Sequence, residues 1–110
     1  MGKWKIIQTK GESEPWWFFD DWRKDITAVF ECESKSDTID QYIKKIGKLK
    51  KDFTYLKHKN YHTVAFWNPS EKVFCEACDD DLQIYHGLII MCDDNLVDIK
   101  NEESVKKVLQ

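Results

Sequence analysis

Apolar and polar residues alternate in two stretches of the N-terminal third, and each stretch predicts a β-strand. In residues 3–9, Trp4 and Ile6 lie between lysines, which is the period of two that a half-buried strand shows. In residues 26–33, the small, aromatic and thiol side chains fall on one face, whereas charged and β-branched side chains fall on the other. We therefore expect the chain to begin with two strands, joined by a segment that includes Gly11 and Pro15.

A different period follows in residues 37–53, where apolar residues recur at steps of three and four. This spacing predicts an amphipathic helix that packs through one face, and Ser34 or Ser36 is suited to cap its start. Gly47 inside the helix costs about 1 kcal/mol relative to Ala, so we expect a close packing contact there. The residues expected to pack are Ile39, Ile43, Ile46 and Leu49.

The rest of the chain reads as four strands and a short terminal helix. The strands are expected at 61–68, 72–75, 84–92 and 96–99, and the helix at 101–109. The connections between the last three strands are too short for parallel crossovers, so these strands should form an antiparallel meander. The pattern predicts an α+β fold, with five to six antiparallel strands in the order β-β-α-β-β-β and one helix over one face.

Composition agrees with one domain spanning residues 1–110. Hydrophobic residues make up 42% of the chain and aromatic residues 14%, which argues against disorder. The longest apolar run, residues 88–92, is far shorter than the ~18 residues of a membrane helix. The N-terminus has no apolar segment of a signal peptide. We therefore expect a cytoplasmic protein with reduced cysteines and no membrane partner.

The net charge of −3 hides two segments of opposite sign. Between residues 35 and 59 there are eight lysines against three aspartates, and between 76 and 103 there are nine acids against one lysine. Two solvated faces of one domain would explain this. A basic helix or an acidic rim that attracts a charged partner would also explain it.

The cysteines and histidines are candidate metal ligands. Cys75 and Cys78, with His86 and Cys92, supply four possible zinc ligands, and His58 or His62 is a possible substitute. However, His86 and Cys92 would lie six residues apart on one strand, roughly 20 Å, which is too far to share an ion. We expect no metal and no cofactor.

Other chemistry at the same residues has weaker support. Three aspartates follow Cys78 directly and disfavour a redox-active thiolate there. Cys75 or Cys78 with His86, oriented by Asp81 or Gln83, matches no nucleophile signature. The aspartate run lacks the glycine of a calcium loop. Structural cysteines and a hydrogen-bonded core histidine explain these residues as well.

The most unusual composition lies in residues 15–22, where five of the seven positions from 16 to 22 are large aromatic residues. We expect some rings to be buried, with one covering the gap at Gly87. One or two others should line a groove edged by carboxylates, which suits a cationic ligand or a basic peptide. The acids would repel a nucleic-acid backbone. The candidate ligand-binding residues are Trp16, Trp17, Asp20, Asp21, Trp22, Asp79, Asp80, Asp81, Gln83 and His86.

Three stretches resemble one bacterial family. They are Pro15-Trp16-Trp17-Phe18-Phe19-Asp20-Asp21-Trp22, Ala65-Phe66-Trp67-Asn68, and Cys75-Glu76-Ala77-Cys78-Asp79-Asp80-Asp81-Leu82-Gln83-Ile84-Tyr85-His86-Gly87-Leu88. They are similar to the domain of unknown function 1033, small proteins of low-GC Gram-positive bacteria, and the similarity runs roughly from Lys5 to Asp94. The resemblance implies no activity, ligand or catalytic residue.

Three functions are compatible with the sequence. The leading hypothesis is a non-catalytic binding or adaptor protein that uses the aromatic and acidic residues. The second is a hydrolase or transferase that uses His86 with Cys75 or an aspartate. The third is nucleic-acid binding through the predicted helix, whose lysines are Lys44, Lys45, Lys48, Lys50 and Lys51.

Overall fold

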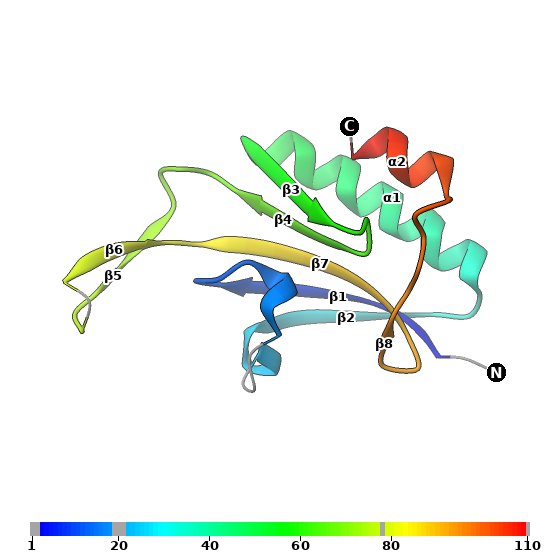
Figure 1. Ribbon diagram of the computed structural model, residues 1–110, viewed down its shortest axis with the longest axis horizontal. Helices are drawn as coiled ribbons and strands as arrows, with labels where there is room; N and C mark the ends of the chain where they lie inside the picture. Colours follow the sequence, from blue (N-terminus) through cyan, green and yellow to red (C-terminus); the bar gives the residue numbers. More distant parts are fainter. Residues whose placement is uncertain (1–2, 19–21, 78, 110) are drawn as a thin grey trace.

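A computed structural model describes residues 3–18, 22–77 and 79–109. Two sheets are present, and two helices lie over the larger one (Figure 1). The strands are β1 (Trp4–Gly11), β2 (Ile26–Cys32), β3 (Tyr55–Lys59), β4 (Thr63–Trp67), β5 (Lys72–Cys75), β6 (Asp80–Gln83), β7 (Tyr85–Cys92) and β8 (Asn95–Leu96). The helices are α1 (Lys35–Asp52) and α2 (Glu103–Val108), with short 3-10 helices η1 (Pro15–Trp17) and η2 (Trp22–Asp25).

The larger sheet has the strand order β2-β1-β7-β4-β3, and β8 pairs with the end of β7. All of its pairs are antiparallel, which confirms the α+β class with an antiparallel sheet. The central strand is β7, in which residues 87–91 are all buried. A strand that is apolar on both faces needs cover on both faces. The helix-side core covers Leu88 and Ile90, and a smaller core covers Ile89 and Met91 on the opposite face.

Several sequence-based expectations about the strands were wrong. Strands β3 and β6 were not predicted, and residues 61 and 62 belong to a turn. Of the expected strand at 96–99, only Leu96 lies in a strand, the two-residue β8. The expected meander forms only in part, because β7 pairs with β8, whereas β5 pairs with β6 and not with β7.

The main core lies between the sheet and the two helices. Ser34 caps α1 by accepting a hydrogen bond from the backbone N–H of Asp37. Tyr42 and Ile46 of α1 are fully buried against β-strand residues such as Ile90. The four helix residues expected to pack do so, with Ile43 and Leu49 only partly buried.

The expectation of a close contact at Gly47 was wrong. A Cβ atom added at Gly47 would have no atom within 4 Å outside its own helix.

Among the described residues, no helix is both long enough and apolar enough to cross a membrane.

The opposite face of the sheet has a smaller core, in which Ile89 of β7 is covered by Phe18 and Trp22. Near it, η1 crosses the sheet above Gly87. A Cβ atom added at Gly87 would lie 2.6 Å from Cβ of Pro15. The gap at Gly87 is therefore filled by a proline ring and not by the tryptophan ring that we expected.

The small sheet is a hairpin of β5 and β6 that projects from one end of the body (Figure 1). The molecule measures 47 × 28 × 19 Å, and its radius of gyration is 14.2 Å. A compact chain of this length has a radius of gyration of about 13 Å. The projecting hairpin accounts for the difference.

Candidate functional site

Three aromatic side chains form a row across β3, β4 and β7 on the face opposite to α1. Tyr55 and Trp67 are cross-strand partners, and their rings stack with centroids 5.7 Å apart. Tyr85 meets Trp67 edge to face at 5.4 Å. Contacts of this kind hold rings in place on a sheet. Tyr55 nevertheless remains 50% exposed.

A fourth ring, that of Trp17, lies beside this row because η1 packs on β4 and β7. Its Nε1 donates a hydrogen bond to Oε2 of Glu14 at 2.5 Å, and the same carboxylate is hydrogen-bonded to Tyr85. Burial raises the pKa of Tyr85, and the negative charge of Glu14 raises it further. Glu14 thus links two rings, while Trp17 stays 55% exposed. We call Trp17, Tyr55, Trp67 and Tyr85 the aromatic surface.

The rim of the aromatic surface is basic. The Nζ atoms of Lys57 and Lys59 lie 6.0 Å and 5.9 Å from the ring centroids of Trp16 and Trp17, at the limit of a cation–π contact. Both lysines are exposed on β3, which is an edge strand. Two lysines and Glu14 therefore lie beside the tryptophans, whereas Asp20 and Asp21, which we expected at this rim, fall outside the described residues.

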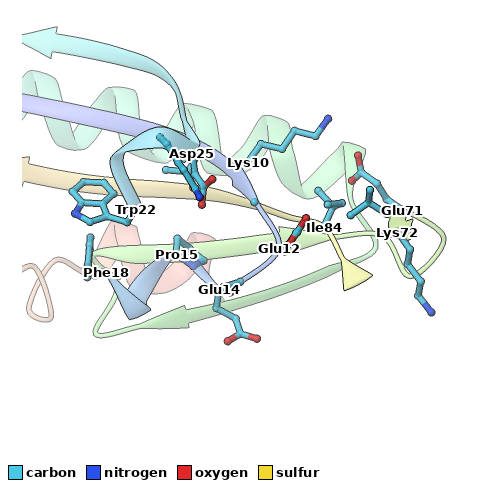
Figure 2. Close-up of a pocket in the computed structure, with 15 residues that line it drawn as sticks. Lys10, Glu12, Glu14, Pro15, Phe18, Trp22, Asp25, Glu71, Lys72 and Ile84 are labelled. Carbon is cyan, nitrogen blue, oxygen red and sulfur yellow. The ribbon is translucent and has the colours of Figure 1, made fainter. Parts of the chain in front are cut away.

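Phe18 and Trp22 line a cavity of about 670 Å³ on the same side of the sheet. Their rings meet edge to face at 5.0 Å, and Figure 2 shows them at one end, with Ile84 and Glu71 at the other. The cavity is where the segment after Pro15 meets the base of the β5–β6 hairpin. Its charged lining residues have both signs, and they are Lys10, Glu12, Glu14, Lys24, Asp25, Glu71 and Lys72.

The described part of the aspartate run lies elsewhere. Asp79 is in the turn of the hairpin, and Asp80 and Asp81 are exposed at the start of β6; none of the three lines the cavity. Asp20, Asp21 and Cys78 fall outside the described residues. Pro15, Phe18 and Trp22 share the cavity with Ile84, whereas the described aspartates of the run lie apart from it.

Gln83 and His86 both hold the turn between β4 and β5. The Nε2 atom of Gln83 donates to the backbone oxygens of Asn68 and Glu71, at 2.8 Å each. Nε2 of His86 lies 2.8 Å from Oε1 of Glu71, and its ring packs on Phe53 with centroids 4.5 Å apart. Phe53 belongs to the helix-side core, so His86 and Trp17 lie on opposite faces of the sheet.

The cysteines and histidines do not gather into a cluster within the described ranges. Among those residues, no group of three or more His, Cys, Asp or Glu side chains could hold a metal ion. Cys92 packs against the helix-side core, whereas Cys75 lies in the projecting hairpin opposite Asp80.

Two lysines of α1 take part in packing. Nζ of Lys45 lies 3.6 Å above the ring of Phe30, and Nζ of Lys50 donates to the backbone oxygen of Val108 at 2.9 Å. The other lysines named for nucleic-acid binding are exposed, and they are Lys44, Lys48 and Lys51.

The row of Tyr55, Trp67 and Tyr85 was missed as a site in the sequence. Its members are separated by 12 and 18 positions and meet only through strand pairing. One signal was available, because Tyr55, Lys57 and Lys59 alternate with Leu56 and His58 in the period of a strand.

No curated protein and no solved structure matches the chain. The resemblance drawn from the Trp-rich motifs is confirmed by a comparison with protein families. The model of the family described as "Protein of unknown function (DUF1033)" matches residues 3–109, and the chain therefore belongs to that family.

Proposed function

We propose that this protein is a non-catalytic binding protein that holds an acidic, extended segment of a partner protein on its aromatic surface. The observation that carries the proposal is the half exposure of Trp17 and Tyr55, at 55% and 50%, in a group of rings that are already fixed by contacts. Exposed Trp and Tyr side chains are the residues that most often supply binding energy at protein interfaces.

The fixed geometry favours affinity. Tyr55 stacks on Trp67, and Trp17 is hydrogen-bonded to Glu14. A partner therefore does not have to immobilise these side chains, and that conformational entropy is not lost on binding. Each ring also buries a large apolar area for few rotatable bonds.

The charges and the strand edge support an acidic, extended segment. Lys57 and Lys59 are exposed beside the rings, so they attract carboxylates and repel basic segments. On its outer side β3 has no neighbouring strand within the described sheet, and an edge strand can pair with an added strand.

The test is a selection of displayed random peptides on the purified protein, followed by affinity measurements on the enriched sequences. We expect acid-rich peptides that bind the wild type and lose at least about tenfold in affinity to Trp17→Ala/Tyr55→Ala. The matched control is Val29→Ala, which removes an apolar side chain that is 49% exposed on the other edge strand; it should bind normally.

Two results would contradict the proposal. One is enriched peptides that bind Trp17→Ala/Tyr55→Ala as well as the wild type. The other is no enriched peptide but tight, salt-dependent binding of a single-stranded oligonucleotide, which would assign the aromatic surface to base stacking.

A further inference from the structure

The β5–β6 hairpin exposes two apolar side chains, of which Val73 also lines the cavity at the base of the hairpin. Its strands pair only with each other in the described structure, and Phe74 and Val73 are 58% and 41% exposed. An isolated two-stranded hairpin is marginally stable in water, and exposed apolar surface is stabilised when a partner covers it. The hairpin therefore has the properties of a docking arm.

The end of this arm is acidic. Asp81 is the cross-strand partner of Phe74, and cross-strand partners lie on the same face of a hairpin. One face of the arm thus presents an aromatic ring next to a carboxylate. Further exposed acids follow at the turn, so that the acidic tip consists of Glu76, Asp79, Asp80 and Asp81.

The aromatic surface has the complementary pattern. On β3, the exposed ring of Tyr55 is followed on the same face by Lys57 and Lys59. A segment with a ring next to carboxylates matches a surface with rings next to ammonium groups, both in apolar contact and in charge. The chain therefore carries both halves of an interface.

The positions of the two halves suit a symmetric pair of chains. The aromatic row lies at the end of the sheet from which the hairpin leaves: Trp67 closes β4 shortly before β5, and Tyr85 opens β7 shortly after β6. In Figure 1, β5 and β6 point away from β3 of the same chain. A two-fold axis near this end would place each hairpin on the other chain's aromatic surface, which is a closed, isologous arrangement.

We infer that the β5–β6 hairpin docks on the aromatic surface of a second copy of this chain, in a reciprocal dimer. This inference rests on the proposed function, because the second copy's hairpin is an acidic, extended segment of the kind that the aromatic surface binds. The two occupants compete, so an acidic partner peptide converts the dimer into monomers.

The experiment is sedimentation of the full chain, alone and in mixtures, with two charge-reversal variants. Asp80→Lys/Asp81→Lys makes the hairpin basic, and Lys57→Glu/Lys59→Glu makes the surface acidic. In each variant, the hairpin and the aromatic surface carry charges of the same sign and repel each other. The dimer dissociation constant of each variant should therefore be at least about tenfold higher than that of the wild type. An equimolar mixture restores both complementary contacts, so it should form a heterodimer with roughly the wild-type constant.

A third variant tests the apolar contact. Phe74→Ser changes a side chain that is 58% exposed, and it should weaken the dimer on the order of 30-fold. Circular dichroism of the variant checks that the fold is kept. Val29→Ala is again the control and should leave dimerisation unchanged.

The outcomes separate this inference from the proposed function. A wild-type chain that stays monomeric up to about 1 mM but binds acidic peptides refutes the dimer and leaves the proposed function in place. A wild-type chain that neither dimerises nor binds acidic peptides refutes both the dimer and the proposed function. A wild-type dimer that is unaffected by the charge reversals and by Phe74→Ser uses another interface, which also refutes the inference.

Discussion

Replacing Gly87 by alanine tests how η1 is seated on the sheet. An added Cβ atom at this position would lie 2.6 Å from Cβ and 2.9 Å from Cγ of Pro15, and it would also meet the hydroxyl of Thr9. Carbon atoms pack best at about 3.5–4.0 Å, so the overlap is about 1 Å. The Thr9 hydroxyl is able to rotate away, whereas the proline ring cannot yield without moving η1.

The expected cost follows from these contacts. Overpacking a buried site destabilises by about 1–3 kcal/mol, and the lower entropy of the unfolded alanine chain offsets about 0.4–1 kcal/mol. Gly87→Ala should therefore lower the free energy of unfolding by roughly 0.5–2.5 kcal/mol. Gly47→Ala is the matched control, because its Cβ meets nothing within 4 Å outside its own helix. It should stabilise α1 by about 0.5–1 kcal/mol.

The assay is urea unfolding followed by tryptophan fluorescence and by far-ultraviolet circular dichroism. A double-mutant cycle with Pro15→Gly isolates the contact: in that background, Gly87→Ala should lose most of its cost. The reasoning is refuted if Gly87→Ala is as stable as the wild type, or if its cost is the same with and without the Pro15 ring. Because η1 carries Trp17, Gly87→Ala should also lower the affinity of the protein for the acidic peptides selected on the aromatic surface.

Three further predictions concern the core and its response to pH. Ile46→Ala should lower the free energy of unfolding in urea by about 2–5 kcal/mol, because Ile46 is fully buried. Leu49→Ala should cost less, because Leu49 is only partly buried. A larger cost for Leu49→Ala would contradict the assignment of the buried face of α1. Tyr42→Phe should cost about 1–2 kcal/mol, because it removes the 2.7 Å hydrogen bond from the buried hydroxyl to the backbone oxygen of Tyr61; a neutral effect would show that this bond contributes nothing. Burial lowers the pKa of His58 below its usual 6.5, so the unfolded chain binds more protons and stability should fall as pH drops below about 6.5. His58→Gln should flatten that part of a plot of melting temperature against pH, and an unchanged slope would contradict the assignment.

The sequence by itself located the elements that show a regular local pattern of apolar residues. The three- and four-residue steps of apolar residues located α1, since a helix brings such positions to one face whatever it packs on. The buried run 88–91 located β7 for a similar reason, because an apolar strand needs no specific partner to be recognised. The Trp-rich motifs located the family.

Strand pairing was decided by the tertiary structure. The sequence suggested that β5 would pair with its neighbour β7, but β7 pairs with β1 and β4 in the middle of the sheet, where a separate core covers each of its two apolar faces. Strand β3 was missed because its polar residues carry a weak local signal, and its place at the edge depends on pairing with β4.

The candidate site depended on this pairing most of all. Trp17 stood out in the sequence, but its neighbours Tyr55, Trp67 and Tyr85 come from three strands and have no common local motif. Lys59 near Trp17 belongs to β3, whereas Asp80 and Asp81, which were also expected near the tryptophans, lie on the projecting hairpin. Composition revealed which side chains were unusual, but the register between distant strands decided which of them meet, because that register is set by the whole core and not by any one segment.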